Sequence, residues 1–96
     1  MLLEIITPEH HIFKGEAEAI QLPGLDGSFQ VLKGHAPIIS GLSQGTVKVE
    51  LTSPFEGGEK VSELIERDKT NSKVIRVTIK GGVIELLNDK VIVLAE

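Results

Sequence analysis

Apolar and polar residues alternate strictly along two stretches of the chain, residues 47–51 and 75–80. Successive side chains of a β-strand point to opposite faces of its sheet, so every second residue shares one environment. The pattern therefore predicts two strands. Each should bury its valine, leucine or isoleucine side chains on one face and expose its polar residues on the other.

Shorter apolar segments between turn-forming residues predict four further strands, at residues 2–6, 19–22, 83–87 and 91–94. Proline and glycine end the first two, because proline has no N–H for the ladder and glycine accepts a positive φ. The residues Asn88-Asp89-Lys90 predict a three-residue hairpin connection between the last two. Apolar residues occupy both faces of residues 91–94, which predicts a strand buried on two sides. This rhythm of short strands favours an all-β sandwich or barrel.

Residues 54–72 do not show this pattern of short strands. They predict a surface excursion, that is, a long loop that leaves the sheet. They contain a proline, a Gly-Gly pair and eight charged residues. Within them, Val61, Leu64 and Ile65 fall at helical spacing, which predicts one or two turns of amphipathic helix over residues 61–67.

Composition narrows the class of protein. The 96 residues, 41% hydrophobic and 25% charged, fit one soluble domain over residues 1–96. No apolar run approaches the ~20 residues of a transmembrane helix, and there is no cysteine for a disulfide or thiolate site. With a net charge of −4 and three aromatic residues, the chain offers nucleic acid neither a basic patch nor a stacking platform.

Asp26, Ser28 and His35 lie within ten residues of one another and suggest a nucleophile site. A catalytic serine of this kind needs a strained strand-to-helix elbow, and no helix is predicted after Ser28. The glycine-rich segment around Asp26 also lacks the lysine of a phosphate loop. We expect no catalytic site, and we interpret Asp26-Gly27 as a turn with the glycine at positive φ.

The histidines do not predict a metal site. His10 and His11 are neighbours, so on a strand they would point to opposite faces, and no third nitrogen or sulfur ligand is near. We expect them to be exposed turn residues. His35 precedes Ala36-Pro37, where a histidine makes a local hydrogen bond or contacts a partner. No metal and no cofactor are predicted.

Several blocks of the sequence, in order along the chain, resemble the epsilon subunit of the F-type ATP synthase. The most distinctive is LPGLDGSFQVL at residues 22–32, followed by GHAPII at residues 34–39. The segments at residues 3–9, 13–15, 79–86 and 91–96 resemble the same family.

The resemblance implies a β-sandwich of about ten strands at the foot of the rotor's central stalk. Such a subunit binds the gamma subunit with one side and the membrane rotor ring with one end, and so couples proton flow to ATP synthesis. It is a non-catalytic, peripheral part of the complex, on the cytoplasmic face of the cell inner membrane, and handles neither nucleotide nor nucleic acid.

The resemblance also implies contact residues. Asp26, Gly27 and Ser28 match the loop that rests on the rotor ring, and Thr7, His35 and Ser40 match positions that face the gamma subunit. The family often has an acidic residue where this chain has Ser28. Asp26 would therefore supply the only charge of that loop.

The sequence departs from the family in two places. Many members continue into a helical hairpin that can inhibit ATP hydrolysis, whereas this sequence stops at Glu96, so we expect no such inhibition. Residues 54–72 are longer and more charged than the family's usual link. A second hypothesis remains open: a free-standing β-sandwich that binds a protein ligand through this loop.

Overall fold

The computed structural model describes residues 1–56 and 62–96, and in these residues it has nine strands and no helix. The strands are β1 (Leu2–Ile6), β2 (His11–Gly24), β3 (Gly27–Leu32), β4 (Ile38–Leu42), β5 (Gly45–Leu51), β6 (Ile65–Arg67), β7 (Val74–Ile79), β8 (Gly82–Leu87) and β9 (Lys90–Ala95). The prediction of an all-β fold is confirmed.

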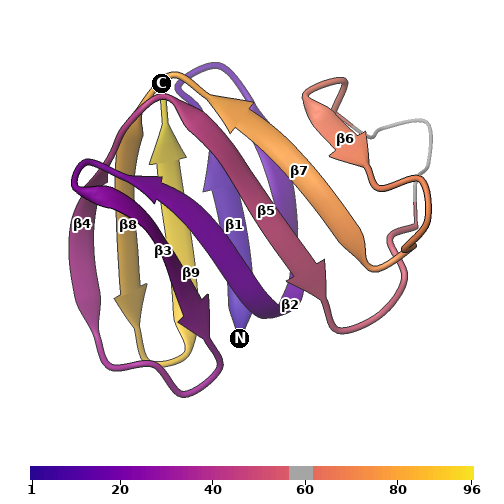
Figure 1. Cartoon of the computed structure of the whole chain (residues 1–96), viewed down its shortest axis with the longest axis horizontal. Helices are drawn as coiled ribbons and strands as arrows, with labels where there is room; N and C mark the ends of the chain where they lie inside the picture. The colour runs from indigo at the N-terminus through magenta and orange to yellow at the C-terminus, as the bar shows by residue number, and fades with distance from the viewer. Residues whose placement is uncertain (57–61) are drawn as a thin grey trace.

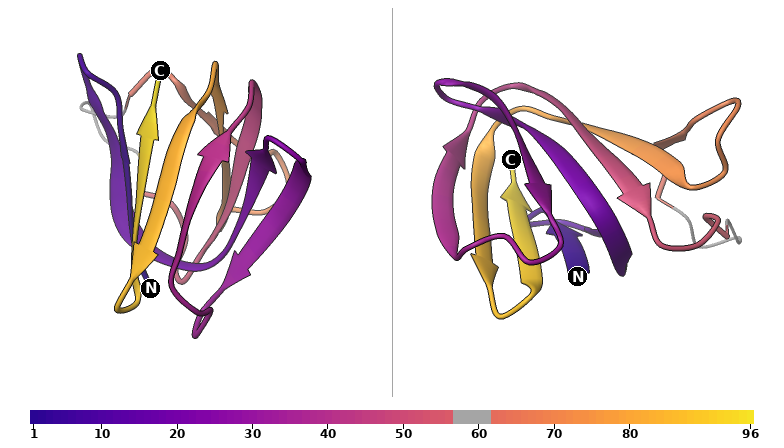
Figure 2. Two further views of the ribbon diagram at one scale, coloured as in Figure 1. Left: turned by 90° about the vertical axis from the view of Figure 1, so that its left-hand side faces the viewer. Right: turned by 60° about the horizontal axis from the view of Figure 1, so that its bottom comes forward.

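The strands form two packed layers (Figures 1 and 2). The long strand β2 belongs to both, because its first half pairs with β1 and its second half with β5 and β3. The first sheet has the order β2-β1-β9-β8-β4, and the second has the order β3-β2-β5-β7-β6. Counting β2 twice gives five positions in each sheet. The expected ten strands are therefore nine strands in ten positions.

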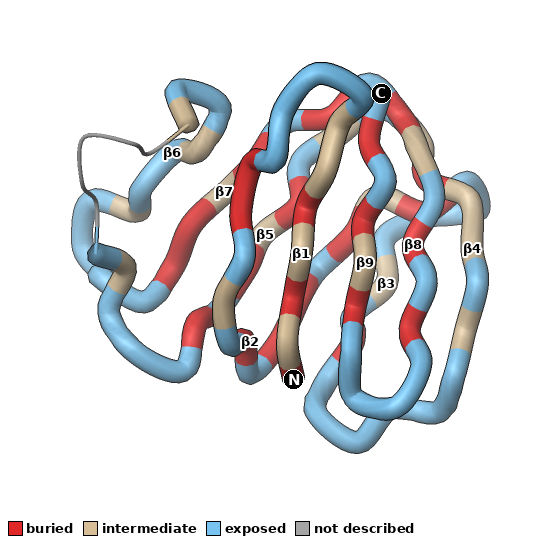
Figure 3. Tube along the Cα trace, turned by 180° about the vertical axis from the view of Figure 1, so that it is seen from behind, coloured by how far each residue is buried: buried red, intermediate tan, exposed pale blue. Residues whose placement is uncertain are grey.

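The core lies between the two sheets and consists of the inward side chains of both. Val47, Val49 and Leu51 of β5 are buried, as are Ile75, Val77 and Ile79 of β7. The alternation predicted for these two strands is therefore confirmed, and Figure 3 shows the same alternation along β8 and β9. The described residues include no buried polar or charged side chain, so packing of apolar groups holds the sheets together.

The hairpin between β8 and β9 is tighter than predicted. Its connection is two residues long, because Lys90 already pairs with Leu87. Asn88 and Asp89 have φ values of 52° and 61°. Positive φ at both positions defines a type I′ turn, whose twist matches that of the flanking strands, and asparagine and aspartate tolerate this conformation. The expected three-residue connection is wrong for that reason.

The helix predicted at residues 61–67 is wrong where the structure describes this segment. Ile65–Arg67 is strand β6, paired antiparallel with β7. A turn begins at Ser62, whose hydroxyl accepts a hydrogen bond from the Leu64 amide and whose carbonyl accepts one from the Ile65 amide. The free edge of β7 provides ladder partners that an isolated two-turn helix lacks. Val61 lies outside the described residues.

Candidate protein-binding surface

One outer surface of the sandwich carries most of its exposed large apolar side chains. Within the described residues there are seven such side chains, and five of them lie on the outer side of the first sheet: Leu25, Ile39, Val83, Leu87 and Leu94. Each is between 42% and 76% exposed. We call these five residues the apolar face. Several exposed apolar side chains on one face are typical of sites that bind other proteins.

The strand register brings the apolar face together. Val83 lies opposite Gly41 on one side and Leu94 on the other. Leu25 belongs to the turn before β3, but its side chain lies over Gly41, where a Cβ atom would meet it. Ile39 and Leu87 complete the surface toward the other end of the strands. Glu85 is the charged residue between them, opposite Ile39.

This surface contradicts the prediction that residues 91–94 are buried on two sides. Val91 and Val93 are fully buried, but Leu94 is 53% exposed. Nothing within the described chain covers the outer side of β9, although its composition is that of a buried strand. The apolar residues of β9 therefore belong to two surfaces: Val91 and Val93 to the core, and Leu94 to the apolar face.

Beyond β9, charged side chains enter the outer side of the first sheet. Glu4 of β1 lies 3.4 Å from Nε2 of His11 and 3.6 Å from Nζ of Lys90. The hydrogen bond with His11, then the charges of Lys90 and Lys14, lower the pKa of Glu4, against partial burial, which raises it. The apolar face is thus bordered by a paired charge cluster.

The outer side of the second sheet is polar throughout its centre. Gln30, Gln21, Lys48, Arg76 and Glu66 lie opposite one another across five neighbouring strands. Such a row of uncharged and charged polar groups is well hydrated. The two sides of the sandwich therefore differ strongly in character, and the first sheet has the surface suited to a protein partner.

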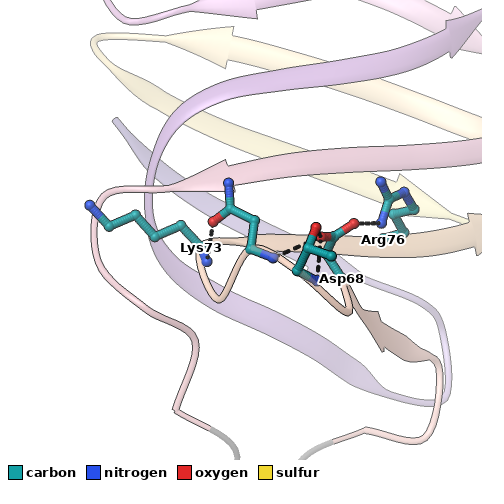
Figure 4. A network of polar contacts seen from close by, with 5 residues as sticks. Asp68, Lys73 and Arg76 are labelled. Atoms are coloured by element: carbon teal, nitrogen blue, oxygen red, sulfur yellow. Dashed lines mark hydrogen bonds and ion pairs between the residues drawn. The ribbon is translucent and has the colours of Figure 1, made fainter.

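Arg76 is held by the turn that follows β6 (Figure 4). Its guanidinium donates a 2.8 Å hydrogen bond to Asp68 Oδ1, and Asp68 Oδ2 accepts hydrogen bonds from Thr70 and Asn71. The Arg76 contact, followed by those from Thr70 and Asn71, lowers the pKa of the Asp68 carboxyl well below its usual value. This cluster fixes the end of the excursion against β7 and leaves Asp68 no free acceptor oxygen for a ligand.

The sandwich has two ends, and the predicted ring-contact residues lie at one of them. Asp26 occupies a two-residue turn between Gly24 and Gly27, and Gly24 pairs with Leu42 at the end of β4. Gly27 has φ 120°, as the turn interpretation predicted. Asp26, Gly27 and Ser28 are all exposed. We call this end the Asp26 end.

Thr7, His35 and Ser40 do not form one cluster. Thr7 follows β1 at the Asp26 end, where its hydroxyl accepts a 2.9 Å hydrogen bond from the His10 amide. His35 lies at the opposite end, in the loop before β4. Ser40 lies in the middle of β4, opposite the buried Ile84, so its side chain points toward the inner side of the sheet.

The exposed histidines have local contacts. His35 Nδ1 lies 2.7 Å from the carbonyl oxygen of Ala36, which confirms the predicted local hydrogen bond. His10 and His11 are exposed, as expected, but His11 is the first residue of β2 rather than part of a turn. No group of three or more metal-ligating side chains occurs in the part of the chain that the structure describes.

The fold and this surface define a class of protein: an all-β sandwich with one apolar outer face. Residues 1–56 and 62–96 contain no helix that is long and apolar enough to cross a membrane.

Sequence comparison places the chain in a family. Residues 1–57 match the model of the ATP synthase delta/epsilon chain β-sandwich domain. An ATP synthase epsilon chain of Chlorobium limicola is 34% identical over 94 residues, which cover 98% of this chain and 86% of that protein. The chain belongs to the ATP synthase delta/epsilon family, and its sandwich is the epsilon-type domain.

Other relatives are longer. An ATP synthase epsilon chain of Salinibacter ruber is 33% identical over the whole chain, and one of Campylobacter lari is 40% identical over 85 residues. The matched regions span 58% and 61% of these two proteins.

Two solved structures share the fold. A chain of the Euglena gracilis mitochondrial ATP synthase superposes with a TM-score of 0.73 and 21% identity, over 99% of this chain and 49% of its own. A chain of the Tetrahymena thermophila mitochondrial central stalk and c-ring superposes with a TM-score of 0.66 and 16% identity, over 99% and 62%.

The sequence interpretation missed the apolar face. Its members are far apart in sequence, and they meet only because β4, β8 and β9 are neighbours. One local signal was available: in residues 91–94 both alternating sets are apolar, so either both sides are covered or one apolar side is exposed.

Proposed function

We propose that this chain is a central-stalk subunit of the rotor of a proton-translocating F-type ATP synthase. In this role it links the gamma subunit to the membrane rotor ring and helps to couple ion flow to ATP synthesis. Family membership supports the proposal, because the similar proteins from Chlorobium, Salinibacter and Campylobacter are ATP synthase epsilon chains.

The observation that carries the proposal is the apolar face. A sandwich that keeps Ile39 and Leu94 at 76% and 53% exposure has a surface that a partner would cover. The gamma subunit is the partner proposed for this side. Binding would remove apolar surface from water while the charge cluster around Glu4 remains at the rim, the arrangement typical of protein interfaces.

The Asp26 end is the end proposed to rest on the rotor ring. Asp26 is exposed on a short turn with Gly27 and Ser28 beside it, so a polar loop of a partner can approach it closely. Thr7 shares this end. Thr7 follows Ile6, which lies opposite Leu94 of the apolar face, so a gamma subunit that covers this face would reach Thr7 at one border. His35 and Ser40 lie next to or within β4, at the other border.

The proposed subunit has no catalytic site of its own and is peripheral to the membrane. It would lie on the cytoplasmic face of the energy-transducing inner membrane. Its contribution to the enzyme complex is mechanical, because torque passes between gamma and the ring through a stiff, closely packed sandwich.

Affinity purification of a tagged copy from its native membrane tests the proposal. Recovery of the gamma subunit and the ring subunits in stoichiometric amounts is the expected result. A tagged Leu94→Glu variant is the matched comparison, since a buried interfacial charge without a partner is costly and should reduce recovery. If the unmodified chain is recovered without any synthase subunit, the proposed function is wrong.

A further inference from the structure

Strand β4 has an unpaired edge. On one side it pairs with β8 along its whole length, from Ile38 opposite Leu86 to Leu42 opposite Gly82. On the other side, the described residues provide one partner position, Gly24 opposite Leu42. The edge of residues 38–41 is therefore open to an additional strand.

The hydrogen-bonding groups at this edge can be assigned. Beyond the end of β4, the Ser43 amide donates to the Pro23 carbonyl of β2, so the backbone groups of Ser43 point to the β2 side. In an antiparallel strand, successive residues direct their N–H and C=O groups to opposite sides. Gly41 and Ile39 therefore point to the same side as Ser43. The N–H and C=O of Ile39 face the open edge, and those of Ser40 face β8.

Strand β4 differs from the edge strands β6 and β3 in the side chains that border its edge. Edge strands of soluble proteins are usually short, charged or otherwise protected against pairing. Strand β6 has three residues, of which Glu66 and Arg67 are charged. Strand β3 has no charged residue either, but its exposed face carries polar Ser28 and Gln30 beside Leu32. Strand β4, with the sequence IISGL, has no charged residue and exposes Ile39 more than any other large apolar side chain of the described chain.

We propose that the gamma subunit binds this edge by adding an extended segment to the first sheet, antiparallel or parallel to β4. This inference rests on the proposed function and specifies how the gamma subunit is held. Unpaired N–H and C=O groups at a sheet edge, here those of Ile39, are recognised by another extended backbone, whose side chains then select among neighbouring pockets.

The surroundings of β4 favour an apolar strand. Ile39 lies beside a shallow hollow formed with Pro37 and Leu87, and Leu25 covers Gly41 on the same outer side. An added strand would direct every second side chain onto this part of the apolar face. His35 lies in the loop that leads into the edge, close to where an added strand would pass, whereas Ser40 directs its backbone to β8 and its side chain inward.

Two substitutions of Ile39 separate the contribution of its backbone N–H to gamma binding from the contribution of its side chain. Ile39→Pro removes the outward N–H and leaves the ladder to β8 complete, because proline is tolerated at an edge where its nitrogen faces solvent. Ile39→Val keeps the N–H and most of the apolar side chain. With the gamma subunit encoded in the same genome as the probe, we expect Ile39→Val to change the Kd by about twofold or less and Ile39→Pro to weaken binding about tenfold or more.

Amide hydrogen exchange of the unmodified chain keeps the proposal testable if Ile39→Pro fails to fold. The Ile39 amide should exchange markedly more slowly once gamma is bound, and the amides of β6 should be unchanged. If gamma binds while the Ile39 amide stays unprotected, or if both variants bind like the unmodified chain, strand addition is wrong and the proposed function stands. If the unmodified chain does not bind gamma, both proposals are wrong.

Discussion

Asp68 organises the described end of the excursion between β5 and β7. Both of its carboxylate oxygens accept hydrogen bonds, one from Arg76 of β7 and the other from the amides and hydroxyl of the turn that follows β6. Because these contacts favour the ionised carboxyl, its pKa is lower in the folded chain than in the unfolded one. Folding is therefore coupled to pH through this residue.

We predict that Asp68→Asn lowers the stability of the chain at neutral pH and that the difference disappears in acid. An acid with a depressed folded-state pKa stabilises the fold above its unfolded pKa of about 4, and this stabilisation is lost as pH falls below about 4. Urea unfolding at pH 7 and in acid measures both effects. Glu50→Gln, at an exposed carboxyl of β5, is the control and should behave like the unmodified chain. A stability difference between Asp68→Asn and the unmodified chain that persists unchanged in acid would contradict a stabilising role for the ionised Asp68 carboxyl.

Single residues could be predicted from the sequence where local chemistry decides their conformation. Gly27 takes a positive φ, and His35 bonds to the neighbouring carbonyl, as expected. The side to which Ser40 points could not be predicted, because it depends on which strand lies beside β4. A register shift of one residue would reverse it.

At the scale of elements, the excursion between β5 and β7 differs most from its prediction. Strand β6 adds three residues to an edge, and Phe55 packs on the core beside Phe13, with ring centroids 6.2 Å apart. Arg67 lies over the Phe55 ring at 5.1 Å. These contacts attach the segment to the sandwich, but they lie outside the ladder that joins β5 to β7. The Leu51 amide already donates to the Lys73 carbonyl, where the excursion begins and ends.

We predict that residues 52–72 can be replaced by Asn-Gly without loss of the sandwich. The new turn would connect Leu51 to Lys73, which already form a hydrogen-bonded pair, as a two-residue hairpin, a geometry that Asn-Gly favours. Loss of the partly buried Phe55 and Ile65 should lower the free energy of unfolding by roughly 1–3 kcal/mol. Circular dichroism and urea unfolding test the fold, and binding of the gamma subunit should be retained. An insoluble or unfolded variant would mean that the excursion is part of the core.

Strands with strict alternation could be located from the sequence. Strands whose extent depends on the strands beside them, such as β2 and β6, could not. The strands predicted at residues 47–51 and 75–80 appear within a residue or two of their predicted bounds. The length of β2 was underestimated, because residues 19–22 lie in its second half and its first half passes through Gly15 to reach the other sheet. Composition predicts where a strand can form, but the choice between strand and helix near Ile65 depends on the free edge of β7.

At the scale of the whole molecule, the two ends and two faces of the sandwich have separate roles in the proposed function. The apolar face and the β4 edge lie together on one side, and the Asp26 turn lies at one end. Sequence patterning predicted the class of fold, but this arrangement follows from the order of the strands. Side chains far apart in sequence meet only after the sheets have formed.

We predict that Asp26→Lys weakens attachment of the stalk to the membrane ring and leaves the chain folded. An exposed rim charge contributes about 1 kcal/mol or less to binding, so the loss should be partial and should diminish at high salt. Sedimentation of the reconstituted complex with membranes measures it. Glu50→Lys makes the same charge change on the second sheet, distant from the Asp26 end, and should have no effect. Equal retention of both variants would argue against the Asp26 turn as the ring contact.

Restoration of coupling in a synthase depleted of its epsilon subunit tests the central claim most directly. Membrane vesicles with the depleted enzyme are mixed with the purified chain, and ATP-driven proton uptake is measured by fluorescence quenching. If the chain is the rotor link, uptake should return toward the level of the intact enzyme, in proportion to the chain bound. Uptake that stays at the depleted level with the chain bound to gamma would contradict the account.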